Sequence, residues 1–91
     1  MSLFELSGFQ RDLLVVIAGH DTPSGQDVKE DLERELGSEI NHGRLYPNLD
    51  TLVDREYVEK GTIDRRTNYY AITDRGRKRL RERREWEEQS L

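Results

Sequence analysis

Apolar residues recur at helical spacing in three successive stretches of the chain. The first stretch has apolar residues one to four positions apart: Phe9, Leu13, Leu14, Val16 and Ile17. Ser7 precedes this stretch as a capping residue and Gly19 follows it. The pattern therefore predicts a first helix between these two residues.

A second helix is predicted between Ser24 and Gly37. Ser24 is followed three positions later by the carboxylate of Asp27, which is the spacing of a reciprocal cap. Apolar residues lie at successive four-residue steps: Val28, Leu32 and Leu36. Gly37 is placed to end the helix in the left-handed conformation.

The segment Asn41–Arg55 predicts a third, amphipathic helix with Asn41 as its cap. At 3.6 residues per turn, one side is apolar: Leu45, Leu49, Leu52 and Val53. Its outward side offers hydrogen-bonding groups and little negative charge: Arg44, Asn48 and Thr51. Pro47 normally costs about 3 kcal/mol inside a helix, so we expect a distortion that Gly43 helps to tolerate. Such a helix either lies in a DNA groove or is a solvated surface helix.

After Arg55 the apolar period changes from helical to alternating. Tyr57–Ile63 and Tyr69–Thr73 are rich in β-branched and aromatic residues, and the polar segment Asp64–Asn68 separates them. This pattern predicts a two-stranded hairpin with a basic tip. Two residues of one parity are expected to face the core and two of the other to face outward: Tyr70 and Ile72, and Tyr69 and Ala71.

A last helix is predicted from the Thr73 cap to about Gln89, with few apolar residues among many charges. A long polar helix that carries an isolated tryptophan usually needs a partner surface. We therefore interpret residues 74–89 as a dimerisation helix. The expected dimer interface combines the apolar residues of this helix with those of the N-terminal segment: Phe4, Leu6, Leu80 and Trp86.

Charge is distributed unevenly along this acidic chain. The formal net charge is -4, but Arg65–Arg84 contains nine basic and two acidic residues and carries +7, which leaves -11 for the remainder. Such asymmetry is typical of a protein that meets a polyanion, although a basic run is also often a solvated helix face. The sequence leaves open whether Arg75–Arg84 faces DNA or an acidic protein surface.

The composition restricts the source and the class of protein. We expect residues 1–91, with 33% hydrophobic content, to form one small and marginally stable domain that a dimer would help to stabilise. Only three of fifteen basic residues are lysine, and acidic residues are abundant, so we expect a halophilic archaeal source. Molar salt shortens the screening length to about 3 Å, which favours close contacts with DNA over long-range attraction.

Several classes of protein are excluded by what the sequence lacks. There is no cysteine, so disulfides and thiol chemistry are excluded. No apolar run approaches the roughly 20 residues of a membrane span, and no signal peptide is visible, so we expect a soluble, cytoplasmic protein. Without a metal-ligand spacing, a nucleophile motif or a phosphate loop, we expect no enzyme, metal site or cofactor.

Three helices, a hairpin and a further helix form a mainly α winged helix-turn-helix, whose third helix enters the major groove. The third helix and the hairpin carry motifs at set separations: Gly43–Leu49, Leu52, Tyr57, Val58, Arg65, Arg66, Tyr69–Asp74 and Gly76. In these motifs the chain resembles the PadR family of transcriptional regulators, especially its short archaeal members, over about residues 9–80.

The resemblance implies a dimeric winged-helix DNA-binding protein whose C-terminal helix helps to join two subunits. The chain departs from the family pattern at Gln26, where an aromatic residue is usual. Its C-terminal region is also much shorter than in the larger members. We therefore do not expect a small-molecule effector to bind here.

Base-reading candidates lie on the third helix. Arg44 is the first choice, because a guanidinium group matches the O6 and N7 acceptors of guanine, although a solvated arginine is the alternative. Asn48 is expected to pair with adenine or a phosphate. Thr51 is expected to touch a thymine methyl group or a phosphate.

The remaining candidates are expected to contact phosphates. His42 is either a phosphate ligand or an ordinary turn histidine, and Tyr46 is expected to be mainly packed, with its hydroxyl free to reach a phosphate. The hairpin tip offers charge and the start of the second helix offers side chains and free amides: Arg65, Arg66, Ser24 and Gln26.

These features predict a homodimeric, sequence-specific transcriptional regulator of double-stranded DNA. Two-fold symmetry predicts an inverted-repeat operator with half-sites about 34 Å apart or a multiple of that distance. The alternative, motivated by the overall acidity, is a winged-helix protein-interaction module that docks its basic hairpin and last helix on an acidic partner.

Overall fold

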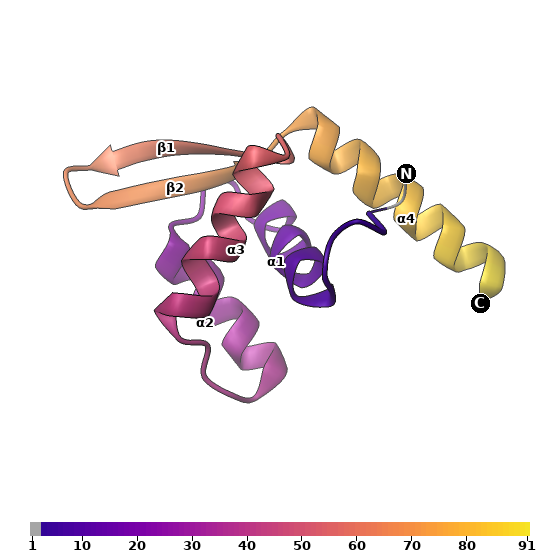
Figure 1. Cartoon of the computed structure of the whole chain (residues 1–91), viewed down its shortest axis with the longest axis horizontal. Coiled ribbons are helices and arrows are strands. Elements are labelled where there is room, and N and C mark those ends of the chain that lie inside the picture. The colour runs from indigo at the N-terminus through magenta and orange to yellow at the C-terminus, as the bar shows by residue number, and fades with distance from the viewer. Residues whose placement is uncertain (1–2) are drawn as a thin grey trace.

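The computed structural model describes residues 3–91, which contain four helices and a two-stranded antiparallel sheet (Figure 1). The elements follow in chain order: α1 (Gly8–Ala18), α2 (Gly25–Leu36), α3 (His42–Asp54), β1 (Val58–Asp64), β2 (Thr67–Ile72) and α4 (Asp74–Ser90). This arrangement confirms the predicted fold class, a mainly α winged helix-turn-helix in which the hairpin is the wing.

Each helix begins at the predicted capping residue. In all four helices the side chain of the cap accepts a hydrogen bond from the amide three residues later, and the caps are Ser7, Ser24, Asn41 and Thr73. Such a cap stabilises a helix by about 1 kcal/mol. Gly37 ends α2 with φ 72°, as expected.

One hydrophobic core joins the N-terminal segment, the first three helices and the base of the wing. Its largest fully buried side chains are Tyr70, Leu3, Leu13, Leu14, Ile17, Ile40, Leu45, Leu49, Leu52, Val28 and Val58. Leu36 is 47% exposed, so the apolar stripe of α2 extends beyond the core. Leu6 was expected at a dimer interface, but it is 3% exposed and packs in the core of its own chain. Its side chain is therefore already covered without a partner.

Helix α3 runs without a break through Pro47, so the expected distortion does not interrupt it. A residue at position 47 would ordinarily donate its amide to the carbonyl of Gly43, and Pro47 has no amide to donate. Gly43 is exposed, so water can reach the carbonyl that is left without an amide donor. The proline is therefore tolerated near the open start of the helix.

The wing is longer and its tip tighter than predicted. Asp64 pairs with Thr67, which leaves only Arg65 and Arg66 in the turn, and the register shifts between Thr62 and Asp64. Residues 64–68 were assigned to a loop because they are polar, but exposed strand ends need no apolar side chains. Two predictions for β2 are confirmed, since Tyr70 is buried and Ile72 packs against the core.

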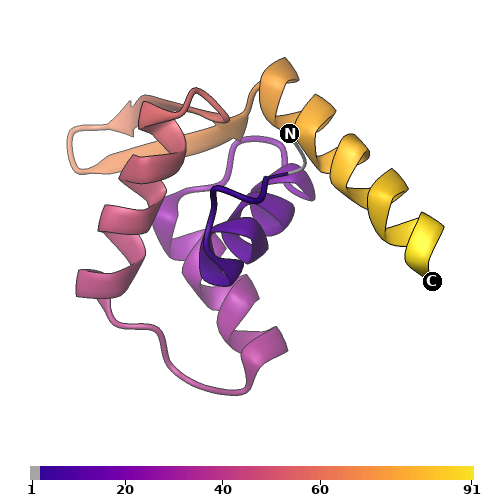
Figure 2. The ribbon, with the colours of Figure 1, turned by 45° about the vertical axis from the view of Figure 1, so that its right-hand side comes forward.

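Helix α4 projects away from the body that the other three helices form (Figures 1 and 2). Near its start, Gly76 is buried where the helix passes the end of α3 and the beginning of the wing. A Cβ at this position would lie 2.4 Å from the carbonyl oxygen of Tyr57. Glycine therefore permits this close crossing. Within the described part of the chain, no helix has the length and apolar character needed to cross a membrane.

Candidate nucleic-acid interface

Arg44 lies on the exposed side of α3, where the base-reading prediction requires it. Its guanidinium carbon is 3.9 Å from the centroid of the Phe9 ring at the start of α1. This stacking leaves the edge of the guanidinium group, with its N–H donors, available to a base. The aromatic ring thus limits the positions that a long, flexible side chain can adopt.

Asn48 is held from two sides. Its Oδ1 accepts a 2.9 Å hydrogen bond from Gln10 Nε2, and its Nδ2 donates to the carbonyl of Arg44 at 2.7 Å. Gln10 is itself fixed, because its Oε1 accepts from the Ser7 amide in the capping box of α1. Asn48 therefore keeps one N–H donor for a DNA acceptor. Thr51 bonds back to the Pro47 carbonyl at 3.1 Å and has its methyl group left for contact.

The outer surface of α3 is more acidic than the sequence suggested. Asp50 and Asp54 are both exposed, and they lie on the side opposite the buried stripe. Lys60 of β1 lies 3.7 Å from the Asp50 carboxylate. The expectation of little negative charge therefore holds for the first turns of α3 but not for its second half.

Tyr46 points toward the start of α2 rather than into open solvent. A Cβ added at Gly25 would lie 2.9 Å from the Tyr46 hydroxyl, so only glycine leaves room for this ring. His42 forms an edge-on contact with Tyr46, with ring centroids 5.6 Å apart. Both residues remain exposed, so the structure brings these two predicted phosphate contacts together.

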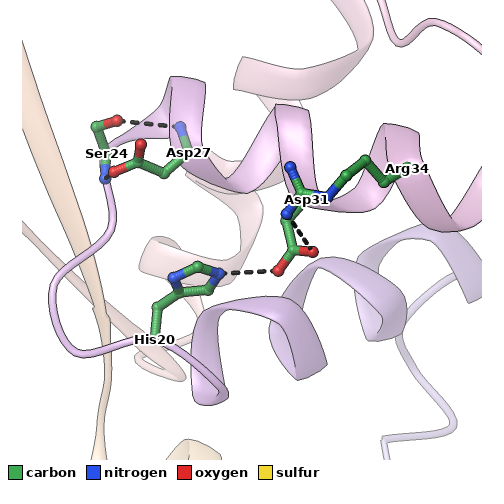
Figure 3. A network of polar contacts seen from close by, with 5 residues as sticks. All are labelled: His20, Ser24, Asp27, Asp31 and Arg34. Carbon is green, nitrogen blue, oxygen red and sulfur yellow. Dashed lines mark hydrogen bonds and ion pairs between the residues drawn. The ribbon is translucent and has the colours of Figure 1, made fainter.

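The start of α2 is a well-formed reciprocal cap (Figure 3). Ser24 Oγ accepts from the Asp27 amide, and Asp27 Oδ2 accepts from the Ser24 amide, each at 3.0 Å. The Ser24 amide is the main cause that holds the pKa of Asp27 below its usual range. Gln26 is exposed and donates to Glu30 at 3.1 Å. Ser24 therefore acts chiefly as a cap, while Gln26 can exchange its contact for a phosphate.

A second polar contact on α2 ties that helix to the end of α1. His20 Nε2 lies 2.8 Å from Asp31 Oδ2, and Arg34 contacts the other oxygen of Asp31 at 3.0 Å (Figure 3). This bond to His20 is the largest cause of the lowered pKa of Asp31. The bond between His20 and Asp31 is the contact that joins α2 to the end of α1, whereas the pair of Arg34 and Asp31 lies within α2.

Arg65 and Arg66 form the exposed tip of the wing, as expected. Asp64 Oδ1 accepts from the Arg66 amide at 2.9 Å, which lowers the pKa of Asp64 and fixes the turn. Among residues 3–91, neither arginine side chain forms an ion pair within 4 Å. Both guanidinium groups are therefore available to phosphates.

The basic run of α4 is partly neutralised within its own helix. Three of its arginines pair with glutamates three or four positions later: Arg79 with Glu82, Arg83 with Glu87, and Arg84 with Glu88. Four exposed cations of this helix have no ion pair among residues 3–91: Arg75, Arg77, Lys78 and Arg81. Part of the basic run is thus paired with glutamates of the same helix, and fewer of its positive charges are unpaired than the sequence suggested.

An aromatic patch lies beside α4. Phe4 and Trp86 contact each other edge-on with centroids 5.0 Å apart, and they are 53% and 41% exposed. The guanidinium carbon of Arg83 lies 4.9 Å from the Trp86 ring centroid. Leu80 is only partly buried and lines an adjoining groove of about 460 Å³ with Leu3 and Val15, among others. Three of the four predicted dimer residues thus lie near an open surface.

Two supporting residues, Phe9 and Gln10, were missed as contributors to the interface. Their contacts with Arg44 and Asn48 bridge α1 and α3. The Ser7–Gln10 spacing marks a capping box, so the sequence contained a signal for the role of Gln10 in the cap. It contained none for the contact with Asn48, 38 residues further along the chain.

The chain matches a family model, a curated protein and several solved structures. The family model described as "Transcriptional regulator PadR-like family" matches residues 13–82. Transcriptional activator GvpE of Haloferax mediterranei is 31% identical over 62 residues, which are 68% of this chain and 32% of GvpE. The chain therefore spans about a third of that curated relative.

Solved structures share the fold of this chain. The structure of H. salinarum RosR grown from NaBr is 44% identical, with a TM-score of 0.87, over 92% of this chain and 76% of RosR. Bacillus subtilis PadR in complex with operator DNA shares the fold, with a TM-score of 0.70 at 24% identity, over 84% of this chain and 46% of PadR. The haloarchaeal relatives fit the halophilic source expected from the composition. The chain belongs to the PadR-like family, whose members are transcriptional regulators and not enzymes.

Proposed function

We propose that this chain is a sequence-specific DNA-binding regulator that inserts α3 into the major groove and places its wing tip on the adjacent backbone. The observation that carries the proposal is one polar pocket shared by three elements. The start of α2, Tyr46 of α3 and Arg66 of the wing line one pocket. Three elements expected to contact DNA thus share one face. The solved complex of PadR with operator DNA supports the same use of this fold.

Within this proposal, base reading belongs to the first turns of α3. Arg44 is stacked and exposed there, and Asn48 has one donor left. Asp50 and Asp54 would repel phosphates, so the second half of α3 is expected to lie away from the backbone. Specificity then depends on a few close contacts, which suits high salt because long-range attraction is screened.

A titration of single-charge variants tests the interface. Arg44→Ala and Arg66→Ala are each expected to weaken binding to fragments of the protein's own upstream region by about tenfold or more, at matched salt. Only Arg44→Ala should also reduce discrimination between sequences, since Arg66 is assigned to a phosphate. Arg34→Ala, which removes a charge from α2, is the matched control. If neither variant weakens binding, the assignment of α3 and the wing to DNA is wrong.

We further propose that residues 1–91 act as one domain in a cytoplasmic homodimer joined through residues 74–89, which lie in α4. Phe4, Trp86 and Leu80 with its groove supply the apolar surface that a second copy would cover. Two-fold symmetry would then place two α3 helices on an inverted repeat, with half-sites about 34 Å apart or a multiple.

Sedimentation tests the dimer separately from DNA binding. Wild type is expected to sediment as a dimer at micromolar concentration, and Trp86→Ala should shift it toward monomer. Ile63→Ala is a suitable control because it removes another exposed apolar side chain, from the wing. A wild-type monomer under these conditions would refute the dimer.

A further inference from the structure

A small polar pocket lies where α2, α3 and the wing meet. Its volume is about 280 Å³, and its lining is mostly polar: Ser24, Gly25, Gln26, Tyr46, Arg66, Thr67, Asn68 and Tyr70. The amide of Tyr70 donates to the Pro23 carbonyl at 2.8 Å, just before α2 begins. The base of the wing is therefore fastened to the start of α2, and the pocket has defined walls.

Tyr70 supplies a buried side chain with an unused hydroxyl. The residue is 1% exposed, and its hydroxyl forms no hydrogen bond with residues 3–91. Every fully buried side-chain nitrogen or oxygen of these residues has a partner, so the Tyr70 hydroxyl must retain some access. The opening available to it is the pocket that it lines. Burial raises the pKa of Tyr70, so the hydroxyl stays protonated and acts as a donor at neutral pH.

Other donors converge on the same pocket. The Tyr46 ring rests against Gly25, which brings its hydroxyl, also without a partner in the described chain, to the start of α2. The amides of Gly25 and Gln26 are the first of α2 and have no carbonyl acceptor. Arg66 adds a positive charge at the wing side. Such a set of donors is complementary to an anion with several acceptor oxygens.

The nearby carboxylates are already engaged. Asp27 accepts from the Ser24 amide at 3.0 Å, and Asp50 lies 3.7 Å from Lys60. Neither carboxylate satisfies the hydroxyls of Tyr46 and Tyr70, to which no hydrogen bond is made. The pocket therefore keeps an excess of donors over acceptors.

From this geometry we infer that the pocket seats one phosphate group of the DNA backbone, with the Tyr70 and Tyr46 hydroxyls and the first amides of α2 as its donors. The inference rests on the proposed function and deepens it. It assigns a DNA contact to Tyr70, a residue that the sequence pattern places only in the core. The seat would fix how far α3 enters the groove, because it is built from three elements at once.

Removal of single hydroxyls tests the seat in the full-length protein. Tyr70→Phe keeps the buried ring and is expected to weaken binding to a DNA duplex selected by the wild type by about tenfold, as is Tyr46→Phe. Tyr69→Phe is the matched control on the same strand, since the Tyr69 hydroxyl faces Glu59 at 3.4 Å. Thermal unfolding of each variant checks that the fold is unchanged.

A backbone scan of the selected duplex identifies the phosphate. Each phosphate in turn is replaced by a neutral methylphosphonate, and one position per half-site is expected to lose affinity for wild type. On the duplex with the methylphosphonate at that position, Tyr70→Phe should bind only slightly more weakly than wild type, because the two changes remove the same hydrogen bond. The phosphate seat is wrong if Tyr70→Phe binds the duplex as tightly as wild type. It is also wrong if the affinity lost through Tyr70→Phe adds fully to the affinity lost through the methylphosphonate at every position.

A titration with inorganic phosphate distinguishes a pocket that binds a DNA phosphate from one that binds a free phosphate ion. The same titration also tests the pocket if no DNA duplex binds. In wild type without DNA, phosphate is expected to shift the amide resonances of Gly25 and Gln26 only weakly, at tens of millimolar. Tight binding of phosphate with no coupling to any methylphosphonate would assign the pocket to a free ion and overturn the inference. If no selected duplex binds at all, the proposed function fails. In that case the absence of phosphate shifts would overturn the seat as well.

Discussion

At the scale of single residues, the side chains expected to read DNA are held by residues that would not touch it. The Phe9 ring stacks on the Arg44 guanidinium group, and Gln10 connects the cap of α1 to the side-chain amide oxygen of Asn48. A base-reading side chain gains when its rotamers are limited before binding, because less side-chain entropy is lost in the complex. The start of α1 therefore belongs to the interface in a functional sense.

Gln10→Glu separates the two roles of this residue. A glutamate can still accept from the Ser7 amide, so the cap of α1 is retained. It cannot donate to Asn48, whose carbonyl would then face a carboxylate. We expect an unchanged thermal midpoint and a loss of about three- to tenfold in DNA affinity. Gln89→Glu, which adds the same charge near the end of α4, should leave the affinity unchanged. A loss of stability without a loss of affinity would contradict the supporting role.

Gly25→Ala tests the packing of Tyr46 against α2. The new Cβ would lie 2.8 Å from a ring carbon of Tyr46, so either the ring or the helix must move. We expect a decrease of about 1–3 kcal/mol in the free energy of unfolding by urea, together with weaker DNA binding. Gly8→Ala is the control, because its nearest neighbour would be 3.9 Å away and alanine suits a helix better. Equal stabilities for the two variants would show that Tyr46 adapts freely.

At the scale of elements, the hydrophobic period and the caps were enough to predict the order and type of every helix and strand. Boundaries failed where burial does not select residues, as in the wing, where half-buried Thr67 and exposed Asn68 pair with Asp64 and Thr62. The outer surface of α3 was misjudged for another reason. The predicted apolar stripe also places Asp50 and Asp54 outward, but the prediction weighed only the hydrogen-bonding residues of that side.

The end of α3 contains a strained residue that can be relieved. Glu56 follows the helix with φ 64°, and its amide and that of Tyr57 donate to the Val53 and Leu52 carbonyls. This is the C-terminal motif in which glycine is usual. Glu56→Gly is expected to raise the free energy of unfolding by about 0.5–1 kcal/mol. Glu35→Gly, in the last turn of α2, should instead lower it, by up to about 1 kcal/mol. Urea titrations of both variants measure these changes. A lower free energy of unfolding for Glu56→Gly would contradict the claim that the backbone at Glu56 is strained.

At the scale of the whole molecule, acidic side chains stabilise the fold through specific hydrogen bonds. The pKa of Glu33 is lowered chiefly by the amide of Ile40, and the pKa of Glu5 chiefly by the hydroxyl of Tyr57. Both bonds connect segments that the sequence pattern leaves unrelated. Net charge and its asymmetry were readable from the sequence, but these pairings depend on the tertiary arrangement and were not.

These shifts predict weaker folding in acid. A carboxylate with a lowered pKa in the folded state stabilises the fold above its unfolded pKa, and that contribution is lost as the pH falls through the folded pKa. The urea midpoint is therefore expected to drop below about pH 4. Glu33→Gln should lower stability at pH 7 and lose less of it on acidification, whereas the exposed Glu85→Gln should follow wild type. An equal acid response for all three proteins would contradict the assignment to Glu33.

The proposed function concerns the molecule as a pair of subunits on DNA. It requires that α3 supply sequence discrimination and that two copies be arranged with two-fold symmetry. The exposed Arg44 supports sequence discrimination by α3. The patch of Phe4 and Trp86 supports the pairing of two copies. The uneven charge supports contact with a polyanion.

Selection from a random pool of duplex DNA at molar salt, followed by footprinting, tests this central claim most directly. We predict enrichment of an inverted repeat and two protected segments whose centres are about one helical turn, or a multiple of it, apart. The enriched sequence should lose its preference for one base pair per half-site when Arg44→Ala replaces wild type. Recovery of no common sequence, or of a preference that Arg44→Ala leaves intact, would contradict the account.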